Sequence, residues 1–496
     1  MKLRSRYVSF VLLIAVLINS CVSLEVNPVS GNKRAFGYSW EEEEKIGAQS
    51  DKEITAQYGV YENEELSNYV SALGQEMLEV SHLRREDTPK KFRETEFTFR
   101  VLDSPVVNAF ALPGGYVYVT RGLLAHLNNE AQLAVVIGHE IGHVAARHAS
   151  QRAVEQQVGQ LAVIGGAVLG ESLGYDGQSI LQLSSQTAQL MFLKYGRDDE
   201  RESDALGVEY AAMQNYEAAE GADFFTSLER ISEQQGGGIP TLLSSHPDPG
   251  EREQTIPQLA EKWREKGYEQ TIEDKDEYLN MIEGIMYGQN PREGFERDGT
   301  FYHPELAFQF PVPAGFQVIN QPSAVILVNE AQDVITQFAI DSENSSPESS
   351  VQQFLAQEGI TVMEEGSSDI NNLNAYQAVA SASGQNGNEL QLLISAISYD
   401  GNIYRFLSYT TASQFEEYND AFLEIAGGFD SLHDESILNV QPVRLQIRAA
   451  NRTAAFSSFI PNNLPMNITA EDIAIINQVH MDDTIEEGTR IKIPVQ

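Results

Sequence analysis

The chain carries an H-E-x-x-H pattern, formed by His139, Glu140 and His143, and no other feature constrains its fold as strongly. Residues four apart in an α-helix lie on the same face, one turn above each other, so both imidazoles can bind one metal ion. Glu140 lies beside the first histidine, where it can take a proton from a metal-bound water. The pattern therefore predicts a helix that carries part of a zinc peptidase site.

The sequence around the motif separates two interpretations. On an exposed amphipathic helix the match would be a coincidence, and the histidines would be solvated. Residues 131–138 are apolar on most faces, which predicts a buried helix that begins after a capping Asn128 or Asn129. Buried imidazoles and a buried carboxylate are costly without partners, and a metal ion supplies one. The context favours zinc, although other divalent ions suit the same ligands in vitro.

A catalytic zinc ion usually has three protein ligands and one open position, so a third ligand is needed further along the chain. Residues 195–207 are typical of a helix start, because Gly196 interrupts the preceding run and acidic residues fill the first turn. Glu200 and Asp204 share a helix face, so one can bind zinc while the other hydrogen-bonds a ligand histidine. Acidic helix starts are also commonly just solvated. Spacing alone leaves three further acidic residues open: Asp199, Glu202 and Glu209.

Several motifs in a fixed order resemble peptidase family M48, the CaaX-prenyl-protease group, in its lipid-anchored bacterial branch. Besides the H-E-x-x-H pattern, the matching stretches are residues 39–47, 58–61, 108–115, 197–204 and 245–247. The resemblance covers residues 38–265 and implies a mainly α zincin-type protease domain with a small β-sheet. It also implies Glu200 as the third zinc ligand and Asp204 as its companion. Gly196 and Ser203 stand where the family more often has Ser and Ala.

The activity that these residues imply is that of a zinc metalloendopeptidase with one zinc ion per chain. His139, His143 and Glu200 would hold the metal. Glu140 would accept a proton from the zinc-activated water and later deliver it to the leaving amine.

His246 has three interpretations. It stabilises the charge of the tetrahedral intermediate, with Arg252 as a second candidate for that role. It is a fourth zinc ligand that keeps a resting site closed. Or it simply begins a surface turn in the polar segment that contains it.

The substrate is expected to lie along a strand beside the site. Residues 106–112 are a plausible strand, with Asn108, Ala109 and Phe110 as substrate-binding candidates, and Pro113 at its end suits a sheet edge. An open edge can pair with an extended peptide by strand addition, and such pairing depends little on the sequence of the peptide. Unfolded or flexible proteins are therefore the expected substrates. The alternative is a hairpin that serves only as scaffold.

The first 21 residues predict export. Lys2, Arg4 and Arg6 precede an apolar run over residues 7–18, too short for a comfortable membrane span. Cys21, the single cysteine of the 496 residues, follows at once. This arrangement resembles a bacterial lipoprotein processing site and predicts a lipidated Cys21; an ordinary signal peptide cleaved elsewhere is the alternative. We expect the periplasmic side of a bacterial envelope membrane, with the outer membrane favoured.

Charge and hydropathy narrow the partners. The chain has 33 Lys and Arg against 72 Asp and Glu, a net charge of −39, which repels nucleic acid and anionic membrane surfaces. A lipid, not charge, would then hold it at a membrane. No stretch reaches the ~18 apolar residues of a spanning helix. Residues 161–170 are apolar but short, which favours a buried or lid-forming helical hairpin over a membrane contact.

The length predicts about three domains. The expected N-terminal divisions are a signal peptide (1–21), a linker (22–37), the protease domain (38–270) and a helical linker (271–297). Residues 298–432 combine alternating strands with at least two helices, which predicts an α+β sandwich-like domain of unknown role. Residues 438–496 predict a small strand–helix–strand α/β module. This module distantly resembles the LysM wall-binding module, so peptidoglycan is a candidate partner.

Two function classes remain open. The first is a zinc metalloendopeptidase of the cell envelope that hydrolyses unfolded or misassembled proteins. The second is a lipid-anchored chaperone-like or binding protein with a latent protease domain. The complete set of candidate ligands and a base favours the first class.

Overall fold

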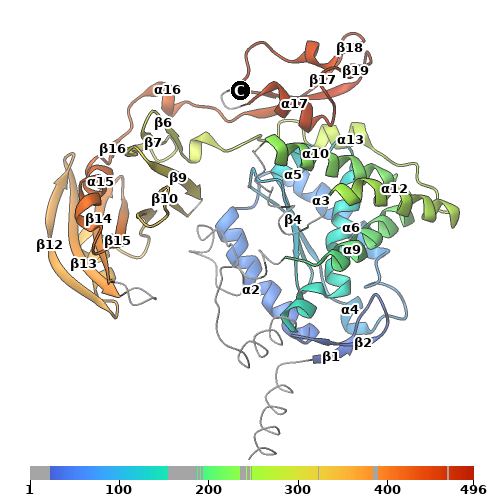
Figure 1. Cartoon of the computed structure of the whole chain (residues 1–496), viewed down its shortest axis with the longest axis horizontal. Helices are drawn as coiled ribbons and strands as arrows, with labels where there is room; N and C mark the ends of the chain where they lie inside the picture. Colours follow the sequence, from blue (N-terminus) through green and yellow to red (C-terminus); the bar gives the residue numbers. More distant parts are fainter. Residues whose placement is uncertain are drawn as a thin grey trace, which may run out of the picture. The chain divides into compact units, whose positions relative to one another are not determined.

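The computed structural model describes residues 23–154, 187, 190, 194–234, 242, 246, 249–321, 323–383, 389–465 and 468–496. The chain forms two compact units, one from residues 1–288 and 443–496 and one from residues 289–442 (Figure 1). The predicted signal peptide, Cys21 and the apolar stretch 161–170 lie outside the described residues. In the described part of the chain, no helix is long and apolar enough to cross a membrane.

The first unit is mainly helical. The helices with described bounds are α2 (Trp40–Tyr58), α3 (Glu64–Glu79), α4 (Lys90–Arg93), α5 (Arg121–His126), α6 (Glu130–Ala146), α9 (Arg197–Met213), η1 (Ala218–Glu220), α10 (Gly221–Gln234), α12 (Pro249–Glu265), α13 (Lys275–Met281), η3 (Phe456–Phe459) and α17 (Ala470–Ile476). A mixed sheet of order β3-β5-β4 comprises β3 (Thr98–Leu102), β5 (Tyr116–Thr120) and β4 (Ala109–Leu112). Strand β4 pairs antiparallel with β5 and forms one edge of this sheet.

Two-stranded ladders complete the first unit. They are β1 (Ser23–Val26) with β2 (Lys33–Phe36), β17 (Arg444–Ala449) with β20 (Arg490–Val495), and β18 (Ala454–Ala455) with β19 (Thr484–Ile485). Residues 23–36 were expected to be part of a linker, but they form the β1–β2 hairpin.

Polar caps fix the ends of the important helices. Ser39 begins α2 in a capping box with Glu42. Asn129, one of the two predicted caps, accepts a hydrogen bond from the main-chain N–H of Gln132 and begins α6. Helix α6 ends at Arg147, which adopts a left-handed conformation with φ of 60°. The side-chain cap at Asn129 and the left-handed conformation of Arg147 therefore fix the two ends of the H-E-x-x-H helix.

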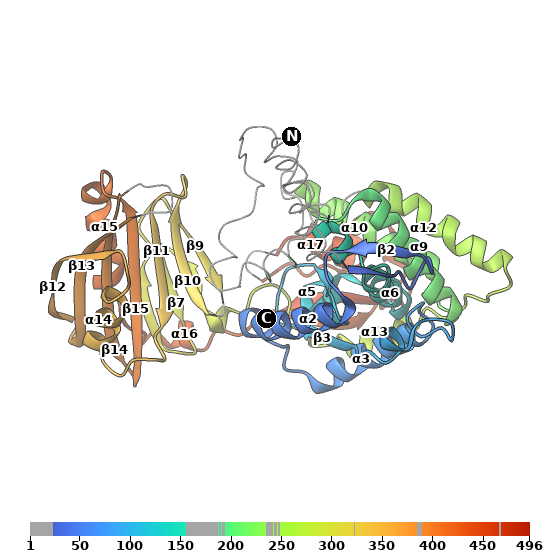
Figure 2. The ribbon, with the colours of Figure 1, turned by 90° about the horizontal axis from the view of Figure 1, so that it is seen from below.

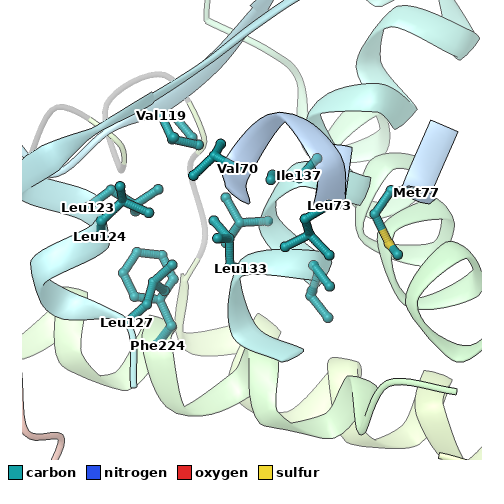
Figure 3. Close-up of a cluster of buried hydrophobic side chains, with 14 of the residues drawn as sticks. Val70, Leu73, Met77, Val119, Leu123, Leu124, Leu127, Leu133, Ile137 and Phe224 are labelled. Atoms are coloured by element: carbon teal, nitrogen blue, oxygen red, sulfur yellow. The ribbon is translucent and has the colours of Figure 1, made fainter. Parts of the chain in front are cut away.

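The main hydrophobic core surrounds α6, in which every residue is buried. Figure 3 shows Val70, Leu73 and Met77 of α3 close to Leu133 and Ile137 of α6. Fully burying one such side chain stabilises a fold by roughly 1.5–3 kcal/mol. The core thus holds the motif helix rigidly, as the apolar flanking sequence predicted.

Glycines set the distance between α6 and α9, which lie side by side (Figure 1). A Cβ atom added to Gly207 would lie 2.8 Å from the main-chain oxygen of Val135 and 2.9 Å from the nitrogen of His139. A Cβ on Gly138 would lie 3.1 Å from the Cα of Gly207. The two backbones can approach this closely because neither residue has a side chain.

The C-terminal residues pack as part of the first unit. Ile475 and Ile476 of α17 and Leu445 of β17 belong to the same core as the protease helices. Lys492 of β20 is fully buried, and its Nζ donates hydrogen bonds to the carbonyl oxygens of Ala125 (2.8 Å) and Leu127 (2.7 Å). The predicted strand–helix–strand order is present. The proposed division of the chain into domains stays a prediction.

The second unit combines sheets and helices. A seven-stranded antiparallel sheet of order β12-β13-β14-β15-β11-β10-β9 comprises β9 (Phe316–Gln321), β10 (Ala324–Asn329), β11 (Ile335–Ile340), β12 (Ile360–Ile370), β13 (Leu373–Ser383), β14 (Glu389–Tyr399) and β15 (Asn402–Thr411), and Figure 2 shows these strands side by side. A four-stranded sheet of order β16-β8-β7-β6 comprises β6 (Phe295–Arg297), β7 (Thr300–His303), β8 (Phe308–Pro311) and β16 (Asp430–Ser431). The helices are η2 (Pro291–Glu293), α14 (Pro347–Leu355), α15 (Phe415–Gly427) and α16 (Glu435–Leu438).

Aromatic side chains from both sheets form the core of the second unit. Phe308 and Phe310 of β8 contact Phe338 of β11, with ring centroids 5.1 and 5.0 Å apart. The expected multidomain chain of helices and several sheets is confirmed at this coarse level.

Candidate active site

Four buried side chains from three parts of the chain converge in the first unit. They are His139 and His143 of α6, Glu200 of α9, and His246, and each offers one ligand atom within 4.8 Å of the others. Helix α6 presents its two histidines because they are one turn apart. Helix α9 presents Glu200 because the glycine contact holds it against α6. His246 reaches the same point from the segment before α12.

The separations of the ligand atoms fit one tetrahedral ion. Ligands about 2.0–2.1 Å from a tetrahedral zinc ion lie about 3.3 Å from one another. Here His139 Nε2 lies 2.9 Å from His143 Nε2 and 3.3 Å from His246 Nδ1. Glu200 Oε1 lies 3.5 Å from His143 Nε2 and 3.1 Å from His246 Nδ1. Three imidazole nitrogens and a carboxylate are typical zinc donors, so this buried group could bind one zinc ion.

Glu140 points toward the same centre. Its Oε1 lies 3.8 Å from His246 Nε2, and its buried Oε2 has no hydrogen-bond partner among the described residues. Burial raises the pKa of Glu140, against the lowering effect of His246 and His139. A buried carboxylate with one oxygen left without a partner is suited to accept a proton from a molecule that enters the site.

Arg252 of α12 connects the two acidic residues of α9. Its Nε donates to Asp204 Oδ2 at 2.8 Å, and its Nη2 donates to Glu200 Oε2. Asp204 Oδ1 in turn lies 2.8 Å from His139 Nδ1. Burial alone would raise the pKa of Glu200, but the charges of His246, His139 and Arg252 lower it to about 2. The structure therefore keeps Glu200 anionic and holds Asp204 beside Nδ1 of His139.

The three alternative acids of α9 face elsewhere. Asp199 pairs with Arg152, with its Oδ2 2.8 Å from Arg152 Nε. Glu209 pairs with Arg85. Glu202 Oε2 lies 3.2 Å from His148 Nε2. Of the four acidic residues that helix spacing could not separate, Glu200 is the one that lies among the converging histidines.

Sequence analysis missed two aromatic neighbours of His143. His148 places its Nδ1 3.0 Å from His143 Nδ1, and the Tyr195 ring stacks on the His143 ring with centroids 3.9 Å apart. A histidine five residues after the motif was visible in the sequence, but helical spacing alone does not bring it back to His143.

The predicted substrate strand lies next to α6, but it is shorter than expected. Strand β4 begins at Ala109, not at residue 106. The Asn108 side chain is buried, and its Oδ1 has no partner among the described residues. Phe110 stacks on Tyr118 with centroids 4.7 Å apart, so its side chain belongs to the core. A small cavity of about 10 Å³ lies between the end of β4 and His143.

Comparison with known proteins agrees with this geometry. Residues 68–260 match the sequence profile of peptidase family M48, and this stretch contains all four converging side chains. This domain belongs to family M48. The chain is 29% identical over 246 residues to the mitochondrial metalloendopeptidase OMA1 of Bos taurus, covering 48% of this chain and 46% of that protein. It is 31% identical over 164 residues to the putative beta-barrel assembly-enhancing protease of Vibrio cholerae, covering 32% of this chain and 34% of that protein.

The chain thus spans less than half the length of either relative that it matches. Among solved structures, cyanobacterial PsbP from Synechocystis is similar over 27% of this chain and 91% of that protein, with 14% identity and a TM-score of 0.23. No statement about function rests on that likeness.

Proposed function

We propose that the chain is a zinc-dependent metalloendopeptidase that hydrolyses peptide bonds of unfolded or misassembled proteins in a bacterial cell envelope. One observation carries the proposal. The M48 domain brings His139, His143, Glu200 and His246 together within 4.8 Å, and beside them lies a Glu140 oxygen that has no hydrogen-bond partner in the part of the chain that the structure describes. Two imidazoles, a carboxylate and a neighbouring glutamate are the donor set and base of a zinc peptidase.

Each residue has a distinct task in this proposal. His139, His143 and Glu200 would hold zinc, which when bound activates water and polarises the scissile carbonyl. Glu140 accepts a proton at its free oxygen and passes it to the leaving amine. Asp204 orients His139 through Nδ1, and Arg252 fixes Asp204 and Glu200 relative to each other. The apolar core around α6 keeps bulk water away from these groups.

The position of His246 favours a second candidate, a latent protease domain. His246 Nδ1 lies 3.1 Å from Glu200 Oε1 and 3.3 Å from His139 Nε2, which is where a fourth ligand would bind. A catalytic zinc keeps this position open for water or substrate. His246 therefore closes the site in this conformation, and it would have to leave before a peptide enters. A surface-turn role does not explain its burial.

Substrates are proposed to pair with the edge of β4 through main-chain groups. Strand β4 is an edge strand beside α6, and its side chains are committed to the core. Backbone pairing at Asn108, Ala109 and Phe110 would accept many sequences. Export, lipidation at Cys21, attachment to the outer membrane and contact with peptidoglycan belong to the same proposal. The name of the Vibrio cholerae relative, which refers to beta-barrel assembly, supports an envelope role.

Zinc content and casein cleavage should be measured for the wild type and for Glu140→Gln. The glutamine keeps the size of the side chain but cannot act as a base. We expect about one zinc ion per chain in both proteins and cleavage only in the wild type. Equal cleavage by both proteins, or no zinc in either, would refute the peptidase. A chaperone role predicts instead that Glu140→Gln still suppresses the aggregation of an unfolded client.

A further inference from the structure

A second histidine stands directly behind the ligand His143. His148 is 1% exposed, and its Nδ1 lies 3.0 Å from His143 Nδ1. On its other side, His148 Nε2 lies 3.2 Å from Glu202 Oε2. The Ser203 hydroxyl lies 3.4 Å from His148 Nδ1. A chain of polar groups therefore leads from the surface carboxylate of Glu202 to the ring of His143.

The end of α6 creates this arrangement. In an uninterrupted helix, five residues correspond to about 500°, which would turn His148 about 140° away from His143. Arg147 instead adopts a left-handed conformation, and a new helical segment starts at residue 148. Arg147 is held there because its guanidinium donates to Glu43 and Glu25. The turn redirects the chain and places the two imidazoles edge to face.

The positions of the protons on these polar side chains decide whether His143 can bind a metal. His143 Nε2 faces the ligand cluster, so in a metal-binding His143 the proton must be on Nδ1. His148 Nδ1 must then accept that proton in a hydrogen bond, and His148 must carry its own proton on Nε2. Glu202 accepts from Nε2, which selects this tautomer of His148. The reverse tautomer would place the His143 proton on Nε2 and block metal binding.

We propose that His148, oriented by Glu202, is a positioning residue that fixes the metal-binding tautomer of His143. This inference rests on the proposed zinc site. The two histidines of α6 then have different supports: Asp204, held by Arg252, lies behind His139, while the imidazole of His148 lies behind His143. Removing such a support typically weakens metal affinity by 10–100-fold.

The test is the zinc dissociation constant of the full chain, measured by competition with a chromophoric chelator. His148→Ala should bind zinc about 10–100-fold more weakly than the wild type. His148→Asn should recover most of this loss, because its amide oxygen can accept from His143 Nδ1. His126→Asn is the matched control: His126 is also a buried histidine of this unit, but it hydrogen-bonds Gly122 and should leave zinc affinity unchanged.

A double mutant tests the link to Glu202. Glu202→Ala should weaken zinc binding, and combining it with His148→Ala should add nothing further, because the two residues act through one contact. If His148→Ala does not fold, His148→Asn and Glu202→Ala still carry the test, since the Glu202 side chain is 36% exposed.

Four outcomes would overturn the inference. They are wild-type affinity in His148→Ala, an equal loss in His148→Ala and His148→Asn, full additivity in the double mutant, and a matching loss in His126→Asn. A wild type that binds zinc without cleaving casein would refute the proposed activity alone. A wild type that binds no zinc would refute both proposals.

Discussion

The contact between α6 and α9 predicts a large effect of the smallest substitution, Gly207→Ala. The new Cβ would lie 2.8 Å from Val135 O and 2.9 Å from His139 N, where ordinary contacts begin at 3.4 Å. Both neighbours are main-chain atoms of a fully buried helix, so no side chain can rotate away. The two helices must separate by roughly half an ångström. Overpacking of this kind costs about 1–3 kcal/mol.

The same shift would reach the metal site. Ligand sets tolerate displacements of only about 0.5 Å, and Glu200 lies on the helix that would move, two turns before Gly207. We expect the melting temperature of the first unit to fall by roughly 2–4 °C per kcal/mol lost. Zinc affinity should fall about tenfold, which corresponds to about 1.4 kcal/mol.

Calorimetry and chelator competition measure both quantities. Gly427→Ala is the matched control, because a Cβ at this position in helix α15 meets nothing within 4 Å. The control should retain wild-type zinc affinity and lose no stability. If Gly207→Ala has the melting temperature and the zinc affinity of the wild type, the close helix contact does not set the ligand geometry.

Three further predictions follow from the buried polar groups and from the C-terminal segment. Arg252→Met should destabilise the zinc-free protein by about 3–5 kcal/mol, because Glu200 and Asp204 lose their shared buried cation; an unchanged melting temperature without zinc would contradict this. Burial lowers the pKa of His126 to about 4, so between pH 6.5 and 4 the folded protein binds fewer protons than the unfolded chain. The free energy of unfolding should therefore fall as the pH drops through this range. Urea titrations should show a shallower pH dependence of this free energy for His126→Asn. A chain that ends at Pro442 should lose thermal stability in its protease unit, since core side chains and a buried lysine are removed; wild-type unfolding of that unit would show that the segment is detachable.

Part of the site could be predicted from the sequence because it depends on one helix. The spacing of His139 and His143, and the apolar residues beside them, follow from helical geometry alone. Glu200 is different, because Asp199, Glu202 and Glu209 satisfy the same local rules. The choice depends on which face of α9 meets α6. That face is set by Gly207, whose missing side chain allows the backbones to meet. A pair of glycines at helical spacing, Gly138 and Gly142, facing Ser203 and Gly207 was the available signal.

The fold of the second unit was predictable for a similar reason. Alternating apolar and polar residues predict strands, and apolar residues at helical spacing predict short helices, so an α+β unit could be expected. The order of its strands could not be predicted, because β11 pairs with β15 across 61 intervening residues. No local pattern encodes a pairing of that separation.

The C-terminal segment shows what a local sequence pattern reveals and what it leaves open. It contains the strands and the helix that its periodicity predicts, and Thr469 caps that helix. What periodicity does not reveal is the partner of each buried face. Lys492 occupies an inward position of β20, where a lysine is costly unless its ammonium finds acceptors. It finds them in the carbonyl groups of Ala125 and Leu127 at the end of α5, just before α6. A lysine between two buried isoleucines of a strand therefore signals a neighbour outside the segment, and here that neighbour is the protease core itself.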